Sequence, residues 1–387
     1  MPTLNLPVAG GKLAPFRTRP PRAFPEARPP FNRIAYAAAH VVSDPLADGD
    51  PWLGAAIDWD ATIAFRRHLW RLGLGVAEAM DTAQRGMGVD WPTSLELIRR
   101  SLDAAADTPG ALIASGAGTD QLEAAPSVTI DDVIAAYEEQ CAAIEKLDGK
   151  IVLMASRALA KAARTPHDYQ KVYGRILEQV KEPVIIHWLG EMFDPALKGY
   201  WGHDDHYKAM EVALDVITAH AHKVAGVKVS LLDKDKEIAM RRHLPQGVRM
   251  FTGDDFNYAE LIAGDAHGYS DALLGIFDVI APAAAAALGA LSREELRSFH
   301  DILAPTVPLS RHIFKAPTRF YKTGVVFMSY LNGLQNHFTM VGGQESARST
   351  LHLAELFRLA DAAGLLLDPE QACARVRRVM AVRGVEA

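Results

Sequence analysis

The sequence has little cysteine and no long apolar run, and each absence excludes a class of protein. Its two cysteines, Cys141 and Cys373, lie far apart in segments of helical pattern, which argues against a disulfide framework or a cysteine-based zinc site. No stretch reaches the roughly 18 apolar residues of a membrane span. The nearest candidate, Ile276–Leu291, is rich in alanine and interrupted by Pro282. The N-terminus also lacks the apolar core of a secretory signal, so we expect a cytoplasmic protein with no membrane partner.

An excess of positive charge is also missing. The 387 residues include 41 Lys and Arg against 47 Asp and Glu, which gives a net charge of −6. A surface that binds nucleic acid needs basic residues to neutralise phosphates, so we expect no nucleic-acid partner. Apolar residues make up 49% and charged residues 23% of the chain. This composition is typical of a globular protein with a large core and excludes disorder.

Short apolar or β-branched runs alternate with longer segments of helical periodicity. Eight runs are strand candidates: Ile34–Ala39, Gly75–Met80, Ala111–Ser115, Ile151–Ala155, Val184–His187, Gly226–Leu231, Val248–Thr252 and His267–Ala272. Each strand with the helical segment that follows it takes about 20 to 40 residues, and eight such units predict an α/β fold of the (β/α)₈ TIM-barrel type. A doubly wound sheet has a similar rhythm. However, its dinucleotide-binding form needs a glycine fingerprint after the first strand, and Ala37–Asp44 contains no glycine.

Three regions follow from this pattern. Residues 1–32 form a predicted Pro-rich extended arm, because the first 30 residues hold 8 of the 22 prolines and proline disfavours helix. Residues 33–291 form the predicted barrel. Residues 292–387 are almost wholly of helical pattern and form a predicted C-terminal helical extension.

A lysine stands in the sixth predicted strand, within Ala225–Leu232. The period of two places Lys228 and Ser230 on one face and aliphatic residues on the other. The aliphatic face suits the surrounding helices, so we expect Lys228 to point into the barrel. A buried lysine pairs with a carboxylate, reaches solvent at a strand end, or loses its proton for chemistry. A neutral amine can attack a carbonyl carbon and form a Schiff base.

Several motifs in the second half of the chain resemble the dihydrodipicolinate synthase and N-acetylneuraminate lyase superfamily. They are Gly226-Val-Lys-Val-Ser230, Phe251-Thr-Gly-Asp-Asp255, Gly268-Tyr-Ser270 with the later Pro282, and Pro317-Thr-Arg-Phe-Tyr-Lys322. The resemblance spans roughly residues 33–332. It implies a metal-independent class I aldolase or lyase in which Lys228 is the Schiff-base residue.

The first half of the chain departs from the family pattern. Thr82 stands for the first threonine of the loop that holds a keto-acid carboxylate, but Ala83 replaces the second and Asp81 adds a negative charge. His187 stands where the family has a proton-shuttling tyrosine, and a histidine can relay protons or be an ordinary core residue. Glu191 lies near the position of a family arginine. These changes favour a neutral carbonyl compound, such as a sugar-derived ketone or aldehyde, over pyruvate.

The predicted site therefore has Lys228 and His187 as catalytic residues. The predicted substrate-binding residues are Asp81, Thr82, Glu191, Ser230, Asp254 and Ser270. We expect no cofactor and no metal, a small-molecule carbonyl substrate, and a homo-oligomer, either a dimer or a tetramer. Two alternatives stay open: a non-catalytic ligand-binding relative, or a metal-dependent sugar-type isomerase or epimerase. The metal ligands of the latter would come from His187, Glu191, His203, His206 and Asp254.

Overall fold

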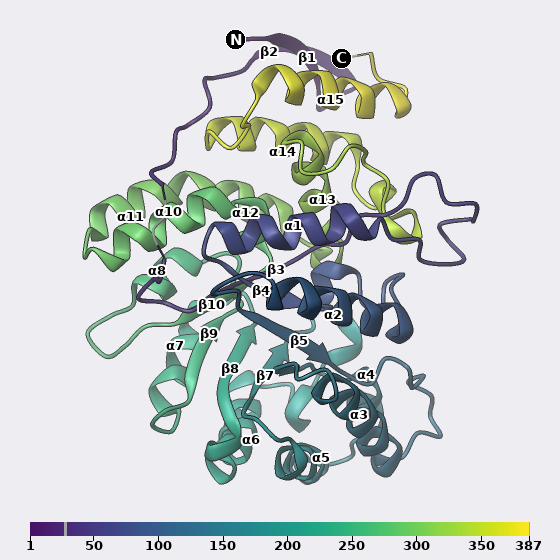
Figure 1. The fold of residues 1–387 in the computed structure, drawn as a ribbon, viewed down its shortest axis with the longest axis vertical. Helices are drawn as coiled ribbons and strands as arrows, with labels where there is room; N and C mark the ends of the chain where they lie inside the picture. Colours follow the sequence, from purple (N-terminus) through teal and green to yellow (C-terminus); the bar gives the residue numbers. More distant parts are fainter. Residues whose placement is uncertain (27–28, 387) are drawn as a thin grey trace.

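The computed structural model describes residues 1–26 and 29–386, and within them eight parallel strands close into a barrel (Figure 1). The strands are β3 (Ala35–Ala38), β4 (Gly75–Glu78), β5 (Ile113–Ala117), β6 (Ile151–Leu153), β7 (Val184–Leu189), β8 (Val224–Ser230), β9 (Arg249–Thr252) and β10 (Asp271–Leu274). They neighbour one another in chain order, and β10 pairs with β3 to close the ring. This confirms the predicted (β/α)₈ fold.

The eighth strand lies later in the chain than predicted. The sequence indicated His267–Ala272, whereas β10 begins at Asp271. Residues 265–268 form a tight turn in which the amide of Asp265 donates to the carbonyl of Gly268, and Gly268 has a φ of 147°. A φ in that range favours glycine over other residues. The strand therefore begins only after this turn, at Asp271.

The interior of the barrel is filled by inward-facing side chains of alternate strand residues. Its apolar members are Tyr36, Ala38, Ala77, Met80, Ala114, Val152, Ile185, Phe251 and Leu273. Two large rings fit because glycines lie against them. A Cβ on Gly75 would come within 2.6 Å of the Tyr36 ring, and a Cβ on Gly226 within 2.6 Å of the Phe251 ring.

The outward faces of the strands pack against the surrounding helices, which form a second, larger core. These helices are α1 (Trp59–Arg71), α2 (Trp91–Ala106), α3 (Ile130–Glu145), α4 (Arg157–Ala162), α5 (Pro166–Gln179), α6 (His206–Ala219), α7 (Lys234–His243), α8 (Tyr258–Ala263), α9 (Ile276–Val279) and α10 (Ala281–Ser292). Asp58, Asp90 and Asp205 precede α1, α2 and α6, and their side chains accept hydrogen bonds from backbone N–H groups in the first turn of each helix.

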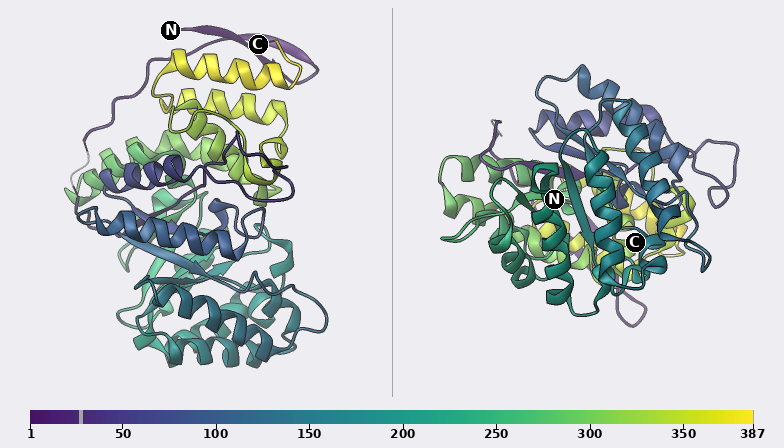
Figure 2. Two further views of the ribbon diagram at one scale, coloured as in Figure 1. Left: turned by 45° about the vertical axis from the view of Figure 1, so that its right-hand side comes forward. Right: turned by 90° about the horizontal axis from the view of Figure 1, so that it is seen from below.

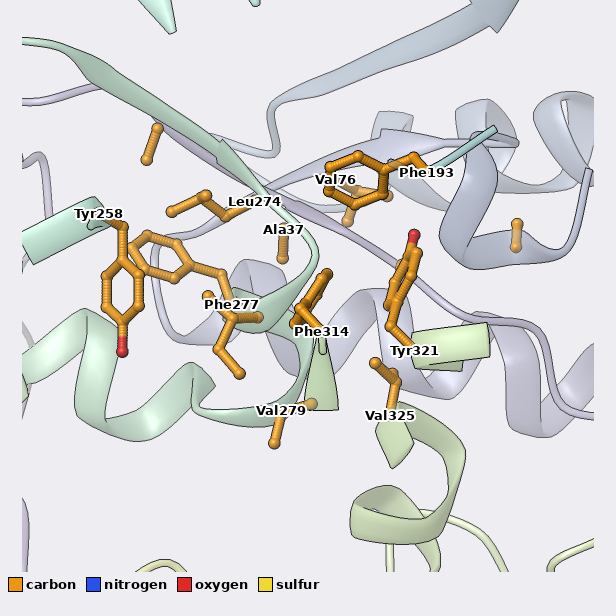
Figure 3. Packing of buried hydrophobic residues seen from close by; sticks show 14 of the residues in the cluster. Ala37, Val76, Phe193, Tyr258, Leu274, Phe277, Val279, Phe314, Tyr321 and Val325 are labelled. Carbon is orange, nitrogen blue, oxygen red and sulfur yellow. The ribbon is translucent and has the colours of Figure 1, made fainter. Parts of the chain in front are cut away.

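The C-terminal helices are α11 (Leu296–Leu303), α12 (Val307–Ile313), α13 (Tyr321–Leu331), α14 (Thr350–Ala362) and α15 (Pro369–Val382). They extend from α11, which packs against α10, to α14 and α15 at one end of the molecule (Figure 1; Figure 2, left). Tyr321, the first residue of α13, stacks on Phe314 with ring centroids 4.4 Å apart, and Phe193 lies edge-on to it (Figure 3). This contact joins the C-terminal helices to the barrel.

The N-terminal arm is more regular than its proline content indicated. Residues in the predicted extended arm form an antiparallel hairpin of β1 (Thr3–Val8) and β2 (Lys12–Arg17). Pro7 and Pro15 fit because a hairpin strand with a free edge tolerates a residue without an N–H. Leu4 and Leu6 of β1 are buried beside α14, with which β1 is in contact. Residues 27 and 28 of the arm lie outside the described residues. No helix within 1–26 and 29–386 is long and apolar enough to cross a membrane.

Candidate active site

Lys228 lies inside the barrel on β8. Its register partners are His187 on β7 and Phe251 on β9, and it is only 6% exposed. Ser230 also faces inward, whereas Val227 and Val229 belong to the outer core. The structure thus places the lysine on the face that the alternating pattern of the strand indicates.

Lys228 lines a closed chamber near the C-terminal ends of the strands, which is the end where barrel enzymes carry their active sites. The polar lining residues are Asp81, Thr82, Lys228, Ser230, Asp255 and Tyr321; the others are Ala38, Met80, Leu189, Phe193 and Gly275. Its volume of about 10 Å³ accommodates roughly one water-sized group. Within the described lining, Lys228 is the one cation.

Burial dominates the electrostatics of this chamber. It lowers the pKa of Lys228, and the carboxylates of Asp81 and Asp255 oppose this shift. Burial also raises the pKa of Asp255 to about 7, although the backbone N–H of Ile276 and the charge of Lys228 act to lower it. Desolvation disfavours the charged form of each group. The amine and the carboxyl group are therefore brought toward similar proton affinities, as a proton-exchanging pair requires.

Tyr321 closes the chamber from the C-terminal helices. Its hydroxyl lies 2.8 Å from Oγ1 of Thr82, and either oxygen can be the donor. Burial, together with the charge of Asp81, raises the pKa of Tyr321 well above its ordinary value, so the phenol is neutral. Sequence reasoning missed this residue, because no local pattern connects the start of a C-terminal helix with a loop in the first half of the chain.

His187 lies beside the lysine but faces a different space. Its Nε2 atom is 3.2 Å from Oγ of Ser230. Burial, with the charge of Lys228, lowers the pKa of His187 well below its ordinary value, so its imidazole is neutral. His187 lines an outer cleft rather than the chamber. It can therefore act on the part of a ligand that extends outward from Lys228.

The outer cleft adjoins the chamber at Asp81 and Leu189, which line both. Its volume is about 320 Å³, within the range of small-molecule sites. The described residues along it include four carboxylates and two guanidinium groups: Asp81, Asp120, Glu123, Asp194, Arg85 and Arg157. Both arginines are already paired.

The pairing of the two arginines decides the charge of the cleft. Arg85 binds Asp120 with an Nη2 to Oδ1 distance of 2.6 Å, and Arg157 pairs with Asp194. The remaining charged groups of the lining, Asp81 and Glu123, are carboxyl groups. The cleft therefore disfavours an anionic ligand. The hydroxyls of Thr119 and Ser156, 2.6 Å apart, add hydrogen-bonding groups to its wall.

Three predicted substrate-binding residues lie outside the chamber. Asp254 uses its carboxylate within its own loop, where it accepts from the amide of Phe256 at 2.8 Å and from Nδ2 of Asn257 at 2.7 Å. Ser270 precedes β10, at the opposite end of the barrel, and its Oγ donates to Glu237 at 2.7 Å.

Glu191, the third of these residues, pairs with His206, with 3.2 Å between Oε2 and Nε2. Its side chain is 39% exposed. It lines neither the chamber nor the cleft. No group of three or more His, Cys, Asp or Glu residues is arranged to hold a metal ion in the part of the chain that the structure describes.

Asp255, the neighbour of the predicted Asp254, is the aspartate of this pair that lines the chamber. Phe251 faces inward, so the period of two places Gly253 and Asp255 on the same inward face and turns Asp254 away. Counting from Phe251 could have found Asp255. Gly253 is itself required there, because a Cβ at this position would lie 2.9 Å from Cε of Lys228 and would also strike Oγ of Ser230.

Comparison with known structures places the fold among the dihydrodipicolinate synthases. A prophage protein of the dihydrodipicolinic acid synthase family from E. coli K12, solved in complex with pyruvate, is 11% identical. The alignment covers 86% of this chain and 99% of that one, with a TM-score of 0.66. Dihydrodipicolinate synthase from Bacillus clausii is 14% identical, with 85% and 97% covered and a TM-score of 0.63. The enzyme from Aquifex aeolicus is 11% identical, with 92% and 99% covered and a TM-score of 0.61.

These likenesses confirm the predicted resemblance at the level of fold. By sequence, the chain belongs to the family described as Protein of unknown function (DUF993), whose profile matches residues 4–385. No curated protein matches the sequence.

Proposed function

We propose that the protein is a class I aldolase or lyase that forms a Schiff base between Lys228 and a neutral, hydroxyl-rich carbonyl compound. The observation that carries this proposal is the buried Lys228 in its chamber, with a lowered pKa and carboxyl groups beside it. A lysine that is neutral part of the time attacks a carbonyl carbon. The iminium that results accepts electrons from a bond broken at the adjacent carbon.

The division of the site into chamber and cleft supports a specific orientation of the substrate. The chamber has room for about one water-sized group, which corresponds to a carbonyl oxygen. The rest of the substrate would then lie in the 320 Å³ cleft. Thr82, held by Tyr321, and Asp81 orient the substrate at the junction, and Ser230 holds His187. His187 moves the proton at the carbon atoms that extend into the cleft.

The charges favour a neutral substrate over pyruvate. The arginines of the cleft are paired with Asp120 and Asp194, and Asp81 stands at the entrance to the chamber. A substrate carboxylate in the cleft would meet the charge of Asp81, and both arginines of the lining are already paired. Hydroxyl groups, in contrast, donate to carboxylates and exchange hydrogen bonds with a neutral imidazole.

The test is reductive trapping with a defined panel. The protein is incubated with pyruvate, hydroxyacetone, dihydroxyacetone or glyceraldehyde and reduced with borohydride, and the adduct is located by peptide mapping. We expect an adduct on Lys228 with the hydroxylated ketones or the aldehyde and none in Lys228→Met. Absence of an adduct on Lys228 with every compound would refute the Schiff-base function. An adduct with pyruvate alone would refute the substrate class.

A further inference from the structure

We propose that Asp255 is the catalytic acid–base residue that serves the amine of Lys228, taking a proton from Nζ and returning protons to the carbonyl oxygen as the Schiff base forms. This inference rests on the proposed function of Lys228. It adds a residue that neither the motifs of the sequence nor the comparisons assign to catalysis.

The position of Asp255 carries the argument. The residue follows β9, is 3% exposed, and lines the same chamber as Lys228. Its Oδ1 accepts the backbone N–H of Ile276 at 2.8 Å, which fixes the carboxyl group against the turn between β10 and α9. A carboxylate has about four lone-pair sites, so this bond leaves the group able to take up and release a proton.

The other polar groups around the lysine are committed elsewhere. His187 lines the cleft rather than the chamber, and its Nε2 contacts Ser230. The hydroxyl of Tyr321 is engaged with Thr82. Asp81 also lines the chamber and its charge acts on Lys228, but it lines the cleft as well, whereas Asp255 lines the chamber alone.

The titration behaviour agrees with this position. Burial raises the pKa of Asp255 to about 7 and lowers the pKa of Lys228. A general acid or base works best when its pKa is near the working pH. At neutral pH, Asp255 is therefore present in both protonation states, whereas an ordinary aspartate would be almost wholly ionised.

The steps balance without any further reagent. The ammonium of Lys228 gives one proton, through one water in the chamber that the two groups share, to the carboxylate of Asp255. The amine lone pair then forms a bond to the carbonyl carbon, the C=O π pair moves to oxygen, and that oxygen takes the proton from Asp255. The nitrogen, now positively charged, returns a proton to Asp255. This proton passes to the hydroxyl, which leaves as water while the nitrogen lone pair forms the iminium.

The variant Asp255→Asn separates proton transfer from a simple effect of charge. Its side-chain oxygen can still accept the N–H of Ile276, so we expect it to fold. Loss of the negative charge alone would make Lys228 easier to deprotonate and would speed adduct formation at pH 7. Loss of the proton carrier would slow adduct formation, by at least about 100-fold for a general acid–base residue. A simple charge effect therefore predicts faster adduct formation in Asp255→Asn than in the wild type, and loss of proton transfer predicts slower adduct formation.

The measurement is the initial rate of adduct formation on Lys228 at pH 7 with the compound that labels the wild type best, quenched with borohydride and expressed per folded protein. The matched control is Asp271→Asn. Asp271 is also a buried carboxylate that accepts a backbone N–H, from Ile34 at 2.7 Å, but it lies at the far end of the barrel. We expect the control to label at the wild-type rate.

The possible outcomes are distinct. Labelling of Asp255→Asn at or above the wild-type rate would overturn the role of Asp255 and leave the proposed function intact. Absence of any adduct in the wild type would overturn both proposals. If Asp255→Asn does not fold, Asp255→Ser supplies an oxygen without a proton carrier of suitable pKa, and the same comparison applies to it.

Discussion

Gly253 makes room for the side chain of Lys228, and its replacement by alanine tests the geometry of the chamber. A Cβ at this position would lie 2.9 Å from Cε of Lys228 and 2.7 Å from the carbonyl oxygen of Val229, and it would also strike Oγ of Ser230. Gly253 does not adopt a positive φ, so alanine fits the backbone conformation there. The effect of Gly253→Ala is therefore steric, and the side chains of Lys228 and Ser230 and the carbonyl group of Val229 must move.

Two magnitudes follow from this crowding. An added methyl group in a packed interior costs about 1–3 kcal/mol of unfolding free energy. A reacting group displaced by about 1 Å loses roughly 100-fold in rate. We expect Gly253→Ala to remain folded in urea titrations but to form the reduced Lys228 adduct about 100-fold more slowly than the wild type. Gly289→Ala is the matched control, because the nearest atom to its new Cβ is 3.6 Å away. A wild-type labelling rate in Gly253→Ala would refute the packing of Lys228 described above.

Three further predictions concern buried polar groups. The guanidinium of Arg66 donates to both carboxylate oxygens of Glu78, at 2.8 and 2.9 Å. Arg66→Met leaves that buried carboxylate without its cation and should lower the unfolding free energy in urea titrations by about 3–5 kcal/mol. A loss below about 1 kcal/mol would contradict this. Tyr321→Phe keeps the stacked ring but leaves the hydroxyl of Thr82 without its partner. Urea denaturation should show a loss of about 1–3 kcal/mol of unfolding free energy. An unchanged denaturation midpoint would argue against that hydrogen bond. Burial raises the pKa of Glu237 from 4.5 to about 8, so its ionisation destabilises the folded state progressively from pH 4.5 to 8. Glu237→Gln should therefore gain stability relative to the wild type across that window, and a pH-independent difference would be the contrary result.

The barrel and the orientation of its lysine could be predicted because both depend on local periodicity. Strand and helix patterns repeat along the chain, and the alternation within Val224–Ser230 determines which face carries Lys228. The same rule, applied from Phe251, separates Asp255 from Asp254. The sequence therefore contained the information needed to choose between these two aspartates.

Other parts of the site depend on contacts between distant segments and could not be predicted in this way. Tyr321 reaches Thr82 because α13 docks onto the barrel, and no periodicity encodes that docking. Ser270 was predicted in the site because it belongs to a family-like motif. The turn at residues 265–268 instead places it before β10, on the side of Glu237. Motif order gives the position along the chain but not the end of the barrel at which a residue lies.

The C-terminal helices therefore form part of the chamber rather than a separate attachment. The ring of Tyr321 stacks on Phe314, which follows α12 (Figure 3). Its hydroxyl lies at hydrogen-bond distance from Thr82, which also lines the chamber. The barrel strands supply Lys228, and the loop after β9 supplies Asp255. Because a buried amine needs both low solvation and a nearby proton acceptor to become a nucleophile, the helices that exclude water are as necessary to the proposed chemistry as the strand that carries the lysine.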